Sequence, residues 1–120
     1  MSDETCTVLF NARCSKCRQA RDLLAEHGVE ADYVHYLEDT PSRDELVRIY
    51  GLLGIDDPRQ MMRTGEHPYR ELELKDADDD ALFDAMVSHP ILIERPIVIR
   101  GDRAVIARPP ERLLELLEDA

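Results

Sequence analysis

The chain has 120 residues, a length typical of a single domain. With 43% hydrophobic and 34% charged residues it has the composition of a globular protein, and no apolar run reaches the ~20 residues that a membrane span needs. A net charge of −11 argues against nucleic acid or an anionic membrane as a partner. The chain start lacks the basic flank and apolar stretch of a signal peptide, so we expect a cytoplasmic protein.

Positive charge is nevertheless concentrated in two stretches of this acidic chain. Residues 5–21 hold four basic residues and no acid. Residues 95–108 hold four arginines, with Asp102 as the one acid. We expect these two stretches, which are far apart in sequence, to build one anion site.

The first third of the chain has the pattern of a βαβ unit. Residues 5–10 are almost all apolar or β-branched, which predicts a short buried strand. Residues 15–27 favour a helix that ends at Gly28, and residues 31–36 alternate as a second strand does. Strand, helix and strand at this spacing predict a parallel pair with a right-handed crossover.

The stretch 40–90 carries few strand signals and reads as helical. We expect a helix capped within Thr40-Pro41-Ser42, a shorter one opened by Asp57-Pro58 that contains Met61 and Met62, and a third over 78–88.

The last third predicts a hairpin followed by a helix. Residues 97–99 and 104–107 form an antiparallel pair around a turn at Gly101-Asp102, and Pro109-Pro110 begin an amphipathic helix that ends near Asp119. The order βαβ, helices, ββα predicts an α/β protein with a thioredoxin-like fold and a mixed four-stranded sheet. We expect one domain over 1–120 with a helical insertion at about 40–90.

Cys14 and Cys17 form a Cys-X-X-Cys pair where the first strand meets the first helix. The N–H groups and positive end of that helix stabilise a thiolate, and Arg13, Lys16 and Arg18 add charge, so we expect a lowered pKa for Cys14. Cys17 is close enough in sequence to resolve an adduct on Cys14 as a disulfide. Two other interpretations are half of a zinc site, although the four histidines show no spacing that supplies a second ligand pair, and two inert thiols.

Two further residues have a structural and a functional reading. Cys6 lies in the middle of the first predicted strand, where a cysteine commonly serves as a packing group. Pro96 follows Arg95 at the start of the third strand. A thioredoxin-like fold places a cis proline there, facing the nucleophilic cysteine, and the alternative is a trans proline on an edge strand.

Four segments of the chain resemble the glutaredoxin-coupled arsenate reductases and their close relatives. They are residues 11–18 around the cysteine pair, 63–72 with its His-Pro-Tyr-Arg-Glu-Leu run, 89–98 and 107–111. The segments occur in order across nearly the whole chain, and the second and third are more specific than the cysteine pair.

The resemblance implies a site. Cys14 matches the nucleophile that attacks arsenate, and Arg63, Arg95 and Arg108 match the arginines around the oxyanion, with Arg18 assisting near the first helical turn. In the family, glutathione then attacks the thiol–arsenate adduct, and glutaredoxin reduces the mixed disulfide. We therefore expect a monomer that takes arsenate or a related oxyanion, uses glutathione as co-substrate, and holds no metal or bound organic cofactor.

The sequence departs from the family pattern at two positions. Phe10 stands where arsenate-reducing members usually carry a histidine that favours the thiolate, which predicts weaker turnover unless the basic residues substitute for it. Cys17 stands where those members usually carry serine. A second thiol permits an intramolecular disulfide, so thioredoxin or glutaredoxin is the expected reductant.

A regulator is the alternative from another class. Spx-like proteins share this fold and use a Cys-X-X-Cys at the same place as a redox switch while they bind RNA polymerase. The cysteine pair fits that reading, whereas Arg63, Arg108 and segment 63–72 favour the reductase. A related thiol-disulfide oxidoreductase with another substrate is the third possibility.

Overall fold

The structure is a computed structural model that describes residues 5–117. The chain divides into two compact units. The sheet unit consists of the chain up to Asp39 and from Arg95 onward, and the helical unit is Thr40–Glu94. Within residues 5–117, no helix has the length and apolar character required to cross a membrane.

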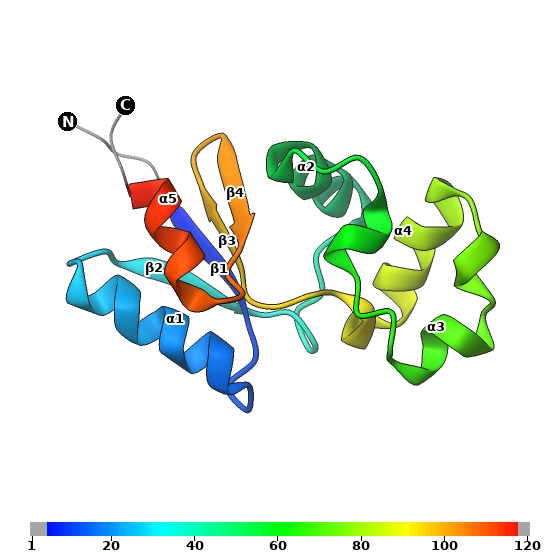
Figure 1. The fold of residues 1–120 in the computed structure, drawn as a ribbon, viewed down its shortest axis with the longest axis horizontal. Coiled ribbons are helices and arrows are strands. Elements are labelled where there is room, and N and C mark those ends of the chain that lie inside the picture. Colours follow the sequence, from blue (N-terminus) through cyan, green and yellow to red (C-terminus); the bar gives the residue numbers. More distant parts are fainter. Residues whose placement is uncertain (1–4, 118–120) are drawn as a thin grey trace. The chain divides into compact units, whose positions relative to one another are not determined.

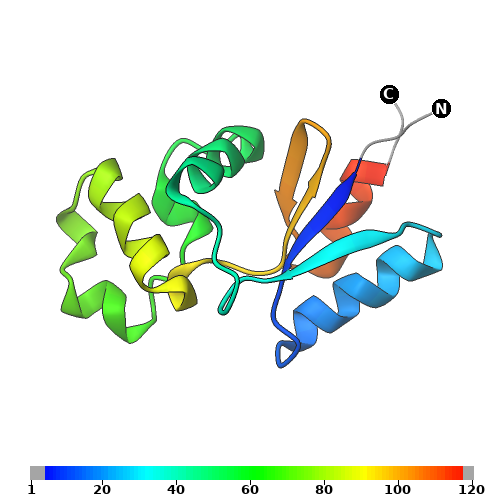
Figure 2. The ribbon, with the colours of Figure 1, turned by 180° about the vertical axis from the view of Figure 1, so that it is seen from behind.

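The sheet unit holds four strands in the order β2-β1-β3-β4 (Figures 1 and 2). Strand β1 pairs in parallel with β2 and antiparallel with β3, and β3 pairs antiparallel with β4. Helices α1 and α5 cover one face of this sheet. The elements are β1 (Cys6–Phe10), α1 (Ser15–Glu26), β2 (Ala31–His35), β3 (Ile97–Arg100), β4 (Arg103–Ile106), the 3₁₀ helix η4 (Pro110–Leu113) and α5 (Leu114–Leu117).

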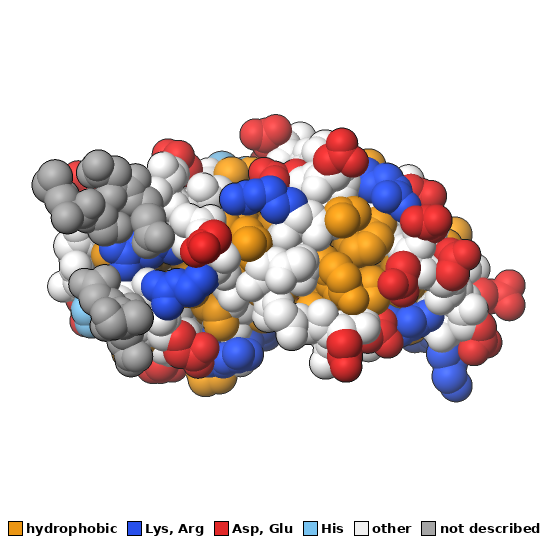
Figure 3. All heavy atoms as spheres, turned by 90° about the horizontal axis from the view of Figure 1, so that it is seen from above, with side chains coloured by type: hydrophobic (Ala, Val, Ile, Leu, Met, Phe, Trp, Pro, Cys, Tyr) orange, Lys and Arg blue, Asp and Glu red, His pale blue; other side chains and the backbone are white. Residues whose placement is uncertain are grey.

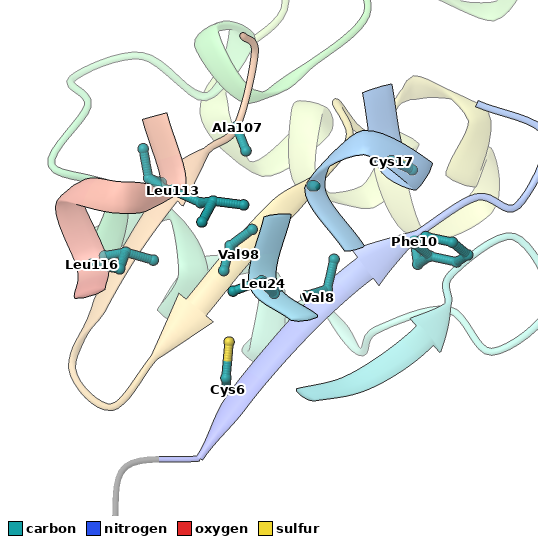
Figure 4. Close-up of a cluster of buried hydrophobic side chains, with 11 residues drawn as sticks. Cys6, Val8, Phe10, Cys17, Leu24, Val98, Ala107, Leu113 and Leu116 are labelled. Atoms are coloured by element: carbon teal, nitrogen blue, oxygen red, sulfur yellow. The ribbon is translucent and has the colours of Figure 1, made fainter. Parts of the chain in front are cut away.

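The core of the sheet unit lies between this face of the sheet and its helices (Figure 4). Side chains alternate along a strand, so Cys6, Val8 and Phe10 of β1 all point to the same face. They pack with Cys17, Ala20 and Leu24 of α1, all fully buried. The rest of the cluster comes from β3, β4, η4, α5 and Ala107, which follows β4. The cluster fixes the first turn of α1 against the end of β1, where the cysteine pair lies.

The helical unit contains no strand among its residues. Its elements are α2 (Arg43–Leu53), η1 (Pro58–Met61), α3 (His67–Glu71), η2 (Leu74–Asp76), α4 (Asp79–Ser88) and η3 (Pro90–Leu92). Ser42 caps α2 by accepting a hydrogen bond from the Glu45 N–H, and Asp78 caps α4 by accepting one from the Ala81 N–H.

Charged side chains tie the helical unit together. Arg43 at the start of α2 pairs with Asp80 at 2.7 Å and with Asp84 at 2.9 Å, both on α4. Arg59 donates to the carbonyl oxygens of Leu74 and Ala77 at 2.8 and 2.6 Å, which ties η1 to η2. Acidic side chains are numerous in Figure 3 on the right, where this unit is drawn.

The predicted elements occur in the structure in the predicted order, and several details differ. The helix opened by Asp57 ends at Met61, and Met62 instead forms an isolated antiparallel bridge with Ile93, so its predicted helical state is wrong. The sequence analysis did not predict α3. The hairpin strands are shifted by about a residue, to Ile97–Arg100 and Arg103–Ile106. The predicted end of the last helix near Asp119 lies outside the described residues.

Candidate active site

The turn between β1 and α1 holds Cys14 in place. The Cys14 N–H donates to the carbonyl of Asn11 at 2.9 Å, and the Arg13 N–H donates to Asn11 Oδ1 at 3.0 Å. Arg18 Nη1 donates to the carbonyl of Ala12 at 2.8 Å, so this guanidinium braces the turn. The sequence analysis assigned no role to Asn11, although an asparagine directly after a strand is a known turn former.

Cys14 is the N-cap residue of α1 and is only partly buried. Its pKa is lowered to about 7. Burial raises this pKa, but the backbone N–H of Cys17, the Arg95 guanidinium, the Cys17 thiol and the backbone N–H of Lys16 together lower it by more. The lowering of the Cys14 pKa agrees with the prediction from the sequence. The cause differs in part, because the charges of Arg13 and Lys16 are not among these causes, and Lys16 acts through its N–H.

Cys17 differs from Cys14 in every respect that matters for reactivity. It is fully buried in the core of the sheet unit, and burial raises its pKa to about 12. Its thiol is protonated at neutral pH and faces the Cys14 sulfur, whose charge raises the Cys17 pKa further. Both cysteines are free thiols, as is the buried Cys6.

Two of the predicted arginines lie beside the Cys14 sulfur. Arg95 interacts with that sulfur, and the interaction raises the pKa of the guanidinium although burial lowers it. Arg108 Nη1 lies 3.9 Å from Cys14 Sγ and donates to the Arg95 carbonyl at 2.8 Å. Arg95 precedes β3 and Arg108 follows β4, so both lie at the open end of this antiparallel hairpin, and the fold of the sheet unit brings them to the start of α1.

Arg63, the third predicted arginine, belongs to the helical unit. Its guanidinium pairs with Glu66 at 3.1 Å and with Glu94 at 3.2 Å. The Arg63 N–H also donates to the carbonyl of Leu92 at 2.7 Å, which holds it beside η3.

The peptide bond between Arg95 and Pro96 is cis, the geometry that the sequence analysis predicts. A second cis bond joins Arg108 to Pro109, and the sequence analysis did not anticipate it. Among residues 5–117, no three His, Cys, Asp or Glu side chains gather in a group that could hold a metal ion.

Comparison with known proteins identifies the family of this chain. The model of the ArsC family matches residues 9–116. The chain belongs to the ArsC family. An arsenate reductase of Haemophilus influenzae is 46% identical over 112 residues, which cover 92% of this chain and 97% of that protein. The uncharacterized protein YfgD of Escherichia coli is 43% identical over the same share of this chain and 94% of its own.

Solved structures agree with this membership in the ArsC family. An arsenate reductase from Vibrio cholerae superposes with a TM-score of 0.91 at 45% identity, over 95% of this chain and 98% of that one. A putative arsenate reductase from Yersinia pestis does so with a TM-score of 0.87, also at 45% identity, over 92% and 98% of the two chains. The predicted thioredoxin-like α/β fold is thereby confirmed.

Phe10, one of the two departures from the ArsC pattern, is a packing residue here. It is 4% exposed and makes edge-on contacts with the rings of Tyr33 and His35, with centroids 5.2 and 5.7 Å apart. The Arg21 guanidinium lies 5.9 Å from the Phe10 ring centroid. The ring supplies no charge toward Cys14, so the thiolate of this ArsC-family chain depends on backbone N–H groups and arginine.

Proposed function

We propose that this ArsC-family protein reduces arsenate to arsenite, with Cys14 as the nucleophile. The observation that carries the proposal is the Cys14 thiol, whose pKa is lowered to about 7 at the N-terminus of α1 beside Arg95 and Arg108. An oxyanion repels a thiolate unless cations meet its charge, and guanidinium groups bind such anions in two-point contacts. The relatives that carry the name arsenate reductase support this choice of oxyanion.

In the first step the Cys14 thiolate attacks the arsenic of arsenate. A sulfur–arsenic bond forms, an arsenic–oxygen bond breaks, and the departing oxygen takes up a proton and leaves as water. Arsenic remains in its +5 state. Arg95 and Arg108 hold the remaining oxygens and stabilise their charge as the bond forms. By the family resemblance, Arg63 is the third oxyanion ligand and Arg18 assists, here by bracing the turn that carries Cys14.

In the second step a glutathione thiolate attacks the Cys14 sulfur. A sulfur–sulfur bond forms, and the sulfur–arsenic bond breaks with its electron pair on arsenic, which is reduced to the +3 state and leaves as arsenite after proton uptake. Glutaredoxin then attacks the glutathione sulfur of the mixed disulfide and releases the Cys14 thiolate. Glutathione is a co-substrate in this scheme, and no bound cofactor takes part.

Cys17 offers an internal alternative for the second step, in which its thiolate attacks Cys14 and a reductant such as thioredoxin reopens the disulfide. Burial raises the pKa of the Cys17 thiol, which keeps it protonated at neutral pH. An exposed external thiol does not carry this burial cost. The burial of Cys17 therefore supports glutathione as the attacking group in this proposal.

The test is an assay of arsenate-dependent NADPH consumption with glutathione, glutaredoxin and glutathione reductase. We expect consumption by the wild-type protein, none by Cys14→Ser, and full activity in Cys6→Ala, the control for loss of a thiol elsewhere. Replacement of glutathione and glutaredoxin by thioredoxin and its reductase isolates the Cys17 route. A folded wild-type protein that consumes no NADPH with either system contradicts the proposal. If that protein also captures the α subunit of RNA polymerase, the regulator reading takes its place.

A further inference from the structure

A groove of about 400 Å³ opens beside the turn that carries Cys14. Residues 10–13 form one part of its lining, and His35, Leu37 and Glu38, at and beyond the end of β2, form the other. All of these residues belong to the sheet unit. The volume lies within the range of small-molecule sites, and the steps assigned to Cys14, Arg95 and Arg108 do not use it.

The lining combines an apolar part with two opposite charges. Phe10 is buried, and Leu37 is 45% exposed, so the groove has apolar surface that a ligand can cover. Arg13 and Glu38 are both exposed, and neither side chain makes an ion pair with any described residue. The groove therefore offers one cation, one anion and an apolar surface to a ligand.

We propose that this groove binds glutathione as it attacks the adduct on Cys14. Glutathione is a small peptide with an ammonium group, two carboxylates and a thiol. Glu38 pairs with the ammonium group, Arg13 with a carboxylate, and Leu37 packs against the methylene groups of the chain. The inference rests on the proposed function for the identity of the thiol.

The position of the groove suits this step. Asn11, Ala12 and Arg13 line it, and the Cys14 N–H donates to the Asn11 carbonyl at 2.9 Å, so the groove borders the turn that ends at Cys14. The Cys14 sulfur is partly exposed and does not itself line the groove, so the glutathione thiol extends past Arg13 to reach it. The step is the one already balanced above: the glutathione sulfur bonds to the Cys14 sulfur, and the electron pair of the broken sulfur–arsenic bond goes to arsenic.

The first experiment measures binding without any reaction. S-methylglutathione, which has no free thiol, is titrated into the ¹⁵N-labelled protein in the absence of arsenate. We expect amide shifts confined to residues 10–13 and 35–38, and an affinity about two- to fivefold weaker in Arg13→Ala and in Glu38→Ala, the loss expected for one exposed charge pair. Arg70→Ala and Asp39→Ala remove exposed charges of each sign outside the groove and should leave the affinity unchanged.

The second experiment measures KM in the arsenate assay at saturating glutaredoxin. We expect the KM for glutathione to rise two- to fivefold in Arg13→Ala and Glu38→Ala, while the KM for arsenate stays at its wild-type value. If S-methylglutathione binds elsewhere on the protein, or loses as much affinity in Arg70→Ala as in Arg13→Ala, the groove proposal is wrong. If the KM for glutaredoxin changes instead of the KM for glutathione, the groove binds glutaredoxin and the glutathione proposal is wrong. If S-methylglutathione binds specifically in the groove but the protein does not reduce arsenate, the groove proposal holds and the proposed function is wrong.

Discussion

The charge state of Cys14 depends on individual neighbours whose contributions can be separated. Arg95 is the one side-chain cation among the causes that lower its pKa. A hydrogen bond to a charged group contributes about 1.5–3 kcal/mol, which corresponds to roughly one to two pH units. The pKa of Cys14 therefore responds to Arg95 far more than to the basic residues that are near it only in sequence.

We predict that Arg95→Ala raises the pKa of Cys14 by about one unit. The thiolate is the reactive form, so alkylation of Cys14 by iodoacetamide should rise with pH around a midpoint of about 7 in the wild-type protein. In the variant the midpoint should lie near 8. Mass spectrometry of the peptide that contains Cys14 separates its reaction from that of the buried Cys6 and Cys17.

Arg21→Ala is the matched control, since it removes a positive charge from α1, the helix that Cys14 caps, and Arg21 is not among the groups that lower the Cys14 pKa. Its midpoint should stay at about 7. Equal shifts in Arg21→Ala and Arg95→Ala show that the total charge of the α1 region sets the pKa, and they contradict the local account.

The thiol of Cys17 gives a second prediction at this scale, because it lowers the pKa of Cys14 as a hydrogen-bond donor. Cys17→Ala removes the donor, so the alkylation midpoint of Cys14 should rise. Cys17→Ser retains a donor at the same position, and its midpoint should stay close to that of the wild-type protein. Both substitutions change a fully buried side chain, so a midpoint that rises equally in the two variants points to altered packing instead of a lost donor.

At the scale of elements, local sequence signals predicted what local interactions determine. The apolar run of β1, the length of α1 and the cap of α2 within residues 40–42 depend on residues close in sequence, and the structure contains all of them. Met62 was assigned wrongly because its state depends on Ile93, 31 positions away, with which it forms a bridge.

The residues of the candidate site fall into the same two groups: those placed by local sequence and those placed by contacts between distant parts of the chain. The Cys-X-X-Cys pair at the start of α1 is a local feature, and sequence reasoning located it. The proximity of Arg95 and Arg108 to Cys14 depends on the pairing of β1 with β3, two strands far apart in sequence, and on the β3–β4 hairpin. The charge pattern pointed to the stretch 95–108 as part of an anion site, and the family resemblance was needed to single out these two of its four arginines. The groove formed by residues 10–13 and Glu38 was missed because it depends on how the loops beyond β1 and β2 are placed, which the predicted pairing of the two strands does not specify.

The cap of α4 gives a prediction at the scale of elements. Asp78 accepts a hydrogen bond of 2.9 Å from the Ala81 N–H, one of the four N–H groups that a helix leaves unpaired at its start. Asp78→Ala should lower the free energy of unfolding of the helical unit by about 1 kcal/mol. Asp78→Asn keeps the acceptor and should be close to wild type. Urea denaturation followed by circular dichroism measures both, and an Asn variant as unstable as the Ala variant contradicts capping as the cause.

At the scale of the whole molecule, the helical unit gives this acidic chain much of its negative charge. Between Glu71 and Asp84 it holds seven acids against Lys75 alone. An oxyanion substrate is repelled by such a surface, so attraction depends on the few cations at the site. By the family resemblance, one of those cations is Arg63 of this unit.

Arg63 thus has two roles to test, ion pairing within the helical unit and oxyanion binding, and two variants are needed to separate them. Its guanidinium pairs with Glu66 and Glu94 in the helical unit, and by the resemblance it also binds arsenate. Lysine retains the charge that pairs with the glutamates but lacks the planar fork that binds an oxyanion at two points. Arg63→Lys therefore tests substrate binding, whereas Arg63→Ala removes both roles.

We predict that Arg63→Lys raises the KM for arsenate about tenfold, because loss of a charge-assisted contact costs about 1.5 kcal/mol or more. The alkylation midpoint of Cys14 should stay at about 7, since Arg63 is not among the causes of its lowered pKa. Arg70→Ala, which removes an exposed cation of α3, should leave both quantities unchanged. If Arg63→Lys keeps the wild-type KM while Arg63→Ala loses stability, Arg63 serves only to hold the helical unit together, and the oxyanion is left to Arg95 and Arg108.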